Sequence, residues 1–159
     1  MPQRDDKQFL ELHQTYRFDV QLNFYEARHE EFSKAHSEAI FASIGLVFLA
    51  GVAGIIASIV PNPELKLVFF LFVAILPVLS TALAAYNALY AFEQQAKLYK
   101  DTFDSLQEAY ALTPALKHGL TADEFSQQVD NYVKEVEHIF QVEQGQWGQL
   151  AEQMRPAET

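Results

Sequence analysis

The sequence predicts an all-α membrane protein, in which a two-span transmembrane helical hairpin continues as long helices into a cytosolic antiparallel helical bundle. Two stretches, residues 39–63 and 67–92, contain no Asp, Glu, Lys, Arg or His. At about 1.5 Å of rise per residue each stretch reaches roughly 37 Å as a helix, enough to cross a hydrocarbon core about 30 Å thick. The polar segments on either side carry apolar residues at helical spacing, which predicts helices there too.

The average composition does not show the division into apolar and polar segments, but it does exclude some classes of function. The mean hydropathy of -0.05 is neutral because polar segments offset the two apolar ones. A mostly polar segment precedes the first apolar stretch, so we expect a retained span and not a cleaved leader. A net charge of -10 without a basic cluster argues against a nucleic acid partner. With no cysteine, the chain has no disulfides, thiolate zinc sites or cysteine nucleophiles.

The N-terminal part is predicted to be a cytosolic helical arm, residues 1–38, that runs straight into the first span, residues 39–60. A short connector, residues 61–66, follows, and its Pro61 and Pro63 end one helix and let the next begin antiparallel. The second span covers residues 67–92. The arm carries apolar residues near helical spacing at Phe9, Leu12, Tyr16, Val20, Phe24 and Ala27.

Basic residues near the spans predict the orientation of the hairpin. The connector offers Lys66, whereas the flanks on the other side offer Arg28, Lys34, Lys97 and Lys100. Because basic residues favour the cytoplasmic side of a membrane, we expect both termini to be cytoplasmic.

The second span is predicted to continue without a break as a cytosolic extension, residues 93–112. A heptad seam of coiled-coil type begins at Leu89, Phe92 and Ala96, and a turn, residues 113–121, ends the extension. Thr121 and Glu124 fit a capping box that starts a C-terminal helix, residues 122–154, before a tail, residues 155–159. The cytosolic seam that joins these helices comprises Tyr99, Phe103, Leu106, Tyr110, Phe125, Val129, Tyr132, Val136 and Trp147.

Each span has a face of small or polar residues. In the second span Ser80, Ala84, Asn87 and Ala91 follow Pro77 at steps of three and four, which indicates either close helix packing or the lining of a wet passage. A pore would require several copies, because two helices alone cannot enclose water. In the first span the small residues Ala50, Gly54 and Ser58 would allow a neighbouring helix to approach closely.

Two Glu-x-x-His pairs, Glu26 with His29 and Glu135 with His138, raise a metal-binding alternative of the di-iron carboxylate type. That chemistry needs two further carboxylates at the same level, and neither Glu93 nor Glu108 is placed there by its spacing. We therefore predict no metal, no cofactor and no catalytic residues. A lone Glu64 in the connector could form an acidic ring only in an oligomer, and we expect it to be solvated.

The arm ending Phe24-Tyr25-Glu26-Ala27-Arg28-His29, the glycine- and alanine-rich first span, the minimal connector and the segment around Trp147 to Pro156 together resemble the SLATT family. Its members are bacterial two-span membrane domains found beside nucleotide second-messenger synthases and SLOG sensor domains. The resemblance implies an effector of a bacterial conflict or antiphage system, in the bacterial inner membrane, that oligomerises and breaches the bilayer when activated. It supplies no catalytic residues.

From the resemblance and the polar face we expect a homo-oligomeric, pore-forming or membrane-permeabilising effector gated by an upstream sensor or nucleotide signal. Its partners would be the lipid bilayer, further copies of the chain, and a sensor or nucleotide-synthase protein. The alternative is a non-conducting two-span anchor or scaffold that recruits a soluble partner through its cytosolic helices.

Overall fold

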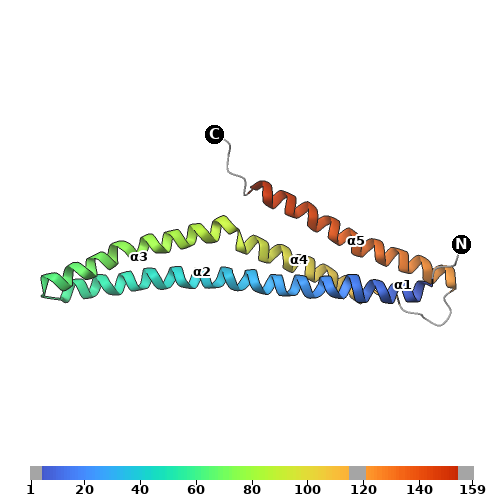
Figure 1. The fold of residues 1–159 in the computed structure, drawn as a ribbon, viewed down its shortest axis with the longest axis horizontal. Coiled ribbons are helices and arrows are strands. Elements are labelled where there is room, and N and C mark those ends of the chain that lie inside the picture. The colour runs from blue at the N-terminus through green and yellow to red at the C-terminus, as the bar shows by residue number, and fades with distance from the viewer. Residues whose placement is uncertain (1–4, 115–120, 154–159) are drawn as a thin grey trace. The chain divides into compact units, whose positions relative to one another are not determined.

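The computed structural model describes residues 5–114 and 121–153, and every secondary-structure element in these residues is helical (Figure 1). Two helical stretches in them are long and apolar enough to cross a membrane. The chain divides into two compact units: a hairpin unit, residues 32–93, and a polar unit, residues 1–31 with 94–159. The elements are α1 (Asp6–His13), the π-helical segment η1 (Gln14–Phe18), α2 (Asp19–Ile59), α3 (Pro63–Tyr90), α4 (Phe92–Ala111) and α5 (Ala122–Gln153).

In the hairpin unit α3 lies alongside the C-terminal part of α2 (Figure 1). The turn is tighter than expected, because α3 begins at Pro63, inside the predicted connector. The side chain of Asn62 caps this helix by accepting hydrogen bonds from the backbone N–H groups of Glu64 and Leu65, at 2.9 and 3.4 Å. Proline suits the first helical position, where its missing N–H has no partner to lose, so the sequence favours this start.

The facing surfaces of the hairpin differ in residue size. The buried face of α2 consists of alanines, namely Ala39, Ala50, Ala53 and Ala57. The inward face of α3 carries larger side chains, including Phe69, Val73, Leu76 and Leu83, with the small Ser80 among them. Small residues opposite large ones let the two helices approach closely, while the other faces of both helices remain exposed and apolar.

The prediction of an unbroken helix through the second span is wrong at one residue. Ala91 adopts a left-handed backbone conformation, with φ 49° and ψ 42°, and separates α3 from α4. Its N–H donates to the carbonyl oxygen of Ala88 at 3.2 Å, which closes the last turn of α3. The heptad pattern did not reveal this break, because a helix end of this type is usually marked by glycine.

In the polar unit three helical segments share one hydrophobic core. Phe18 stacks on Tyr110 and Phe24 contacts Tyr99, so α4 runs opposite to the N-terminal part of α2. Contacts of α5 with η1 and α2 follow the same order along both segments, so these run in the same direction. The buried core consists of Leu10, Phe18, Tyr25, Leu106, Ala109, Phe125, Val129, Tyr132, Val136 and Phe140.

The N-terminal arm is helical and continues into the first span, as predicted, but with a π-helical segment at Gln14–Phe18. A π-helical turn holds an extra residue, which changes the face that later residues present. Leu10, Phe18 and Tyr25 are buried, whereas Leu12, Tyr16 and Val20 of the predicted apolar series are exposed. The π segment therefore leaves an apolar stripe on the outside of the arm.

The capping box that the sequence predicts at the start of α5 is present. The backbone N–H of Thr121 donates to the carboxylate of Glu124 at 2.8 Å, and the Glu124 N–H donates to the Thr121 hydroxyl at 3.3 Å. The hydrogen bonds that the Thr121 N–H and hydroxyl donate to the Glu124 carboxylate lower the pKa of Glu124. Most of the predicted turn, residues 115–120, and the predicted tail lie outside the described residues.

Candidate functional site

The polar residues predicted on the second span form hydrogen bonds with α2 of the same chain. The hydroxyl of Ser80 donates to the carbonyl oxygen of Ser43 at 3.0 Å. Asn87 Oδ1 lies 3.3 Å from Nδ1 of His36. Each polar group thus finds a partner inside the hairpin, as a polar group in hydrocarbon must.

The other members of that predicted face are divided. Ala91 is buried at the helix break, whereas Ala84 is exposed. The face of α3 that points toward α2 includes Leu83 and not Ala84, so the predicted series leaves that face at Ala84. Beside Ser80 the hairpin surface has a groove of about 460 Å³, lined by Ser43, Ile44, Val47, Phe48 and Ser80.

On the first span two of the three predicted packing residues face α3. Ala50 is buried, and a Cβ built on Gly54 would lie 3.7 Å from Cγ2 of Val73, which is ordinary contact. Ser58 is exposed and donates to the carbonyl oxygen of Ile55 on its own helix. The fully buried Ala57 takes the place that the prediction gave to Ser58.

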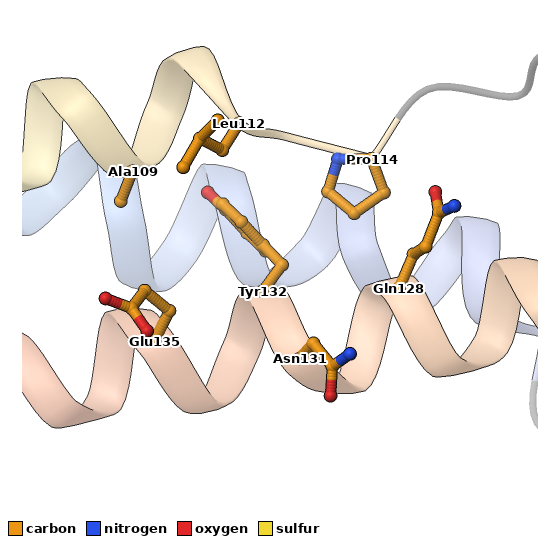
Figure 2. Close-up of a pocket in the computed structure, with 7 residues that line it drawn as sticks. All are labelled: Ala109, Leu112, Pro114, Gln128, Asn131, Tyr132 and Glu135. Atoms are coloured by element: carbon orange, nitrogen blue, oxygen red, sulfur yellow. The ribbon is translucent and has the colours of Figure 1, made fainter.

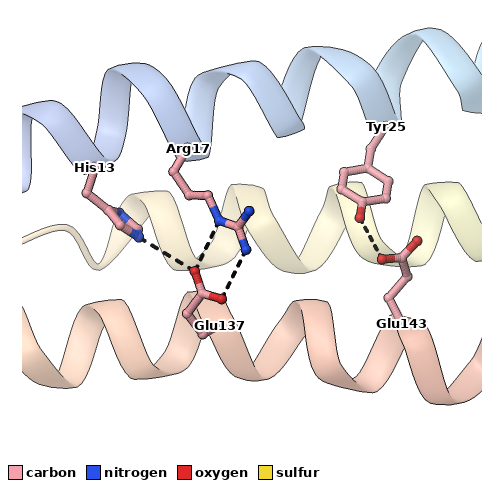
Figure 3. A network of polar contacts seen from close by, with 5 residues as sticks. All are labelled: His13, Arg17, Tyr25, Glu137 and Glu143. Carbon is pink, nitrogen blue, oxygen red and sulfur yellow. Dashed lines mark hydrogen bonds and ion pairs between the residues drawn. The ribbon is translucent and has the colours of Figure 1, made fainter.

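The polar unit contains a network of polar contacts that joins η1 and α2 to α5 (Figure 3). Both guanidinium contacts of Arg17 reach the carboxylate of Glu137, from Nε at 3.2 Å and from a terminal nitrogen at 3.1 Å. The same guanidinium lies 5.0 Å above the ring of Phe140. The bidentate pair fixes the relative register of two helices, and its hydrogen bonds raise the pKa of Arg17.

One carboxylate of this network, Glu143, is held from two sides. The Tyr25 hydroxyl donates to one oxygen at 2.6 Å, and the indole N–H of Trp147 donates to the other at 2.6 Å. Trp147 also contacts Tyr99 edge to face at 5.2 Å, so α2, α4 and α5 meet here. Burial, and then the bond to Glu143, raise the pKa of Tyr25 well above its usual value, which keeps its hydroxyl a donor.

His13 is half-buried beside this network, with both ring nitrogens shielded from solvent. Its Nε2 is 4.0 Å from the Glu137 carboxylate, and neither ring nitrogen has a hydrogen-bond partner (Figure 3). Burial lowers the pKa of His13, and the nearby Glu137 only partly opposes that effect. The imidazole is therefore held in its neutral form among Phe9, Tyr132 and Arg17.

A cavity of about 310 Å³ lies where α4 ends beside α5 (Figure 2). Its polar lining comes from Gln128, Asn131, Tyr132 and Glu135, and none of its seven lining residues is basic. The lining that the structure describes therefore offers amide, hydroxyl and carboxylate groups. The remaining lining residues are Ala109, Leu112 and Pro114.

Most of the predicted cytosolic seam packs into the polar unit. Tyr110 is exposed although its ring stacks on Phe18. Leu106, Phe125, Val129, Tyr132 and Val136 are buried, and Tyr99, Phe103 and Trp147 are half-buried.

The two Glu-x-x-His pairs do not form a metal site in the described residues, which contain no group of three or more His, Asp or Glu placed to hold an ion. Nδ1 of His29 instead lies 3.0 Å from the carbonyl oxygen of Ala96. No sequence pattern indicated the Arg17–Glu137 and Tyr25–Glu143 contacts, because each joins residues more than 100 positions apart.

A family model described as "SMODS and SLOG-associating 2TM effector domain 1" matches residues 14–147 of the chain. The matched range takes in η1, both apolar helices, α4 and α5 as far as Trp147. No curated protein and no solved structure matches the chain.

Proposed function

The chain belongs to the SLATT family of SMODS and SLOG-associating two-transmembrane effector domains, and from this we propose that it is an oligomeric effector that permeabilises a membrane. The membership confirms the resemblance found in the sequence, and it implies a membrane effector role in a conflict system. The proposal adds assembly, membrane leakage and control by a signal.

The observation that carries the proposal is the family match to a two-span effector domain whose two apolar helices have largely exposed outer faces. One hairpin buries little of this surface, so lipid or further copies must cover it. The groove beside Ser80, with Ile44, Val47 and Phe48 in its walls, supports contact with another helix, because it offers a concave surface for packing. In the open assembly Ser80 and Asn87 would leave their partners on α2 and border water together with Ala84.

The exposed stripe on the arm supports assembly of several copies outside the hydrocarbon. Leu12, Tyr16 and Val20 follow one another at steps of four, and Tyr16 is 74% exposed. Such a row on a polar segment is typical of a helix that packs against a partner. We take that partner to be the same stripe of a second copy, which gives the assembly a contact independent of the spans.

Control of the assembly would act through the polar unit. The contacts of Arg17 with Glu137 and of Tyr25 with Glu143 hold α5 against η1 and α2 in one arrangement. A signal that binds another arrangement better would shift the population toward it. We propose that a sensor or a nucleotide-synthase partner supplies that signal on the cytoplasmic side of the bacterial inner membrane, where both termini would lie.

Leakage of a dye from lipid vesicles tests this proposal. Vesicles reconstituted at increasing protein-to-lipid ratio should leak more steeply than in proportion to protein, because several copies make one pore. Asn87→Leu should reduce leakage several-fold, since it removes the amide that would face water. Ala82→Leu, on an exposed face of the same helix, is the matched control and should leak like the natural chain.

A non-conducting anchor is the second candidate function, favoured by the bonds of Ser80 and Asn87 within the hairpin. It predicts a monomer or dimer in detergent and intact vesicles at every protein-to-lipid ratio. Vesicles that stay sealed while the protein is inserted and helical would replace the pore proposal with this one.

A further inference from the structure

The break between α3 and α4 rests on a single strained residue. Ala91 is the one non-glycine residue with positive φ in the part of the chain that the structure describes. A residue with a Cβ disfavours this conformation by about tenfold or more relative to a right-handed helix, which is why glycine usually fills such positions. The surroundings of Ala91 must therefore favour the break.

The sequence around Ala91 would equally form one continuous helix. No glycine or proline occurs between residues 78 and 111, and alanine, glutamate, glutamine and lysine dominate the stretch after the break. These residues are among the best helix formers. The apolar spacing of Leu89, Phe92 and Ala96 also continues through the break without a change of phase.

An aromatic cluster accounts for the broken form. The rings of Tyr90 and Phe92 stack at 5.6 Å with an interplanar angle of 15°. On a continuous helix, residues two apart point about 200° away from each other and cannot stack. Phe92 also contacts Tyr86 at 5.9 Å and Phe32 of α2 at 6.2 Å, so three rings surround it.

We propose that the α3–α4 junction is a two-state switch. In one state Ala91 is left-handed and Phe92 sits in the cluster of Phe32, Tyr86 and Tyr90. In the other state Ala91 is helical, Phe92 leaves Tyr90, and α3 and α4 form one helix. The junction lies within the hairpin unit, and its two states do not depend on whether the protein permeabilises a membrane.

The two states have opposing advantages. The broken state gains ring contacts, each of modest strength, and loses helical hydrogen bonds across the break. The continuous state regains those bonds and relieves Ala91. A ligand, lipid or partner that favours either state by even tenfold would change which one dominates.

Distance measurement between two spin labels tests the switch. The chain has no cysteine, so Ala74→Cys and Gln107→Cys, both at exposed positions, give specific labelling in lipid nanodiscs. A continuous helix would separate these Cα atoms by about 50 Å, at about 1.5 Å per residue, and any bend shortens the distance. We expect the natural junction to give two populations.

Two substitutions should move these populations in opposite directions. Ala91→Gly should favour the shorter distance about tenfold, because glycine accepts the left-handed conformation and weakens the helix. Phe92→Leu should favour the longer distance several-fold, because leucine keeps the apolar position and removes the ring stack. Ala85→Gly, in the interior of α3, is the matched control and should leave the distribution unchanged.

The ¹³Cα chemical shift of a labelled Ala91 gives a second readout, since left-handed and helical backbone differ in it. It applies to the natural chain even if a variant does not fold. A single distance that neither substitution moves, together with an Ala91 shift of only one conformation, would overturn the proposal.

Discussion

The hydroxyl of Tyr25 donates a 2.6 Å hydrogen bond to the carboxylate of Glu143, and this bond joins α2 to α5 from within the core of the polar unit. The two residues are 118 positions apart in the sequence. The carboxylate also accepts from Trp147, so its charge is shared by two donors. A half-buried carboxylate with two hydrogen-bond donors contributes more to the free energy of unfolding than an exposed ion pair does.

Removing the Tyr25 hydroxyl should weaken the polar unit. Tyr25→Phe keeps the ring contacts and removes a hydrogen bond to a charged acceptor, so the free energy of unfolding should fall by about 1–2 kcal/mol. Trp147 is the single tryptophan and bonds to the same carboxylate, so its fluorescence reports unfolding in urea directly. Tyr110→Phe, at an exposed tyrosine, should change this free energy little. Equal effects of the two substitutions would contradict the prediction that the Tyr25–Glu143 hydrogen bond stabilises the polar unit.

Acid should destabilise the polar unit through His13. Its pKa is lowered in the folded chain by burial, so the unfolded chain binds the proton more readily. The stabilisation is complete above the unfolded value of about 6.5 and is lost as the pH falls toward the folded pKa. Thermal unfolding followed by circular dichroism should therefore show a falling midpoint between about pH 7.5 and 5.5.

Two charged groups beside His13 also affect its pKa, so variants of the histidines serve as the test and the control. Glu137 opposes the lowering of the pKa of His13, and Arg17 adds to it. His13→Gln should flatten the pH dependence, while His138→Gln, outside the buried core, should preserve it. An unchanged slope in the His13 variant would show that another group titrates.

A charge on the exposed stripe of the arm should reduce assembly. Tyr16→Lys places an ammonium group in the stripe of Leu12, Tyr16 and Val20, where a second copy would have to desolvate it. We expect the dissociation constant of the assembly to rise by about tenfold or more, which corresponds to about 1.4 kcal/mol. Light scattering of the protein in detergent measures the mass. Thr15→Lys adds the same charge one residue away, and if it dissociates the assembly equally well, the stripe is not the contact.

The sequence predicted the all-helical fold and two spans because uncharged stretches of this length and helical spacing are strong signals. The capping box of Thr121 and Glu124 is local as well, and it is present. The break at Ala91 was not predicted, because the stacking of Tyr90 on Phe92 that favours it is impossible in the continuous helix that the apolar spacing indicates.

The polar contacts were less predictable than the helices. The sequence did not predict the buried face of the arm correctly, because of the π segment. A fixed helical period assigns Tyr16 to the apolar series, whereas Phe18 is the buried residue. The partner of Asn87 is His36, on the other helix of the hairpin, and sequence spacing relates residues only along one helix. The predicted face therefore included Ala84, which is exposed, and omitted Leu83.

The tight turn between the spans limits how the protein can be reached from one side of a membrane. Only residues 60–62 separate α2 from α3, and Asn62 already uses its side chain for the cap. The turn therefore provides very few residues that a soluble ligand, a protease or an antibody could bind. Regulators dissolved in water would have to approach from the opposite compartment, where we expect the polar unit to lie.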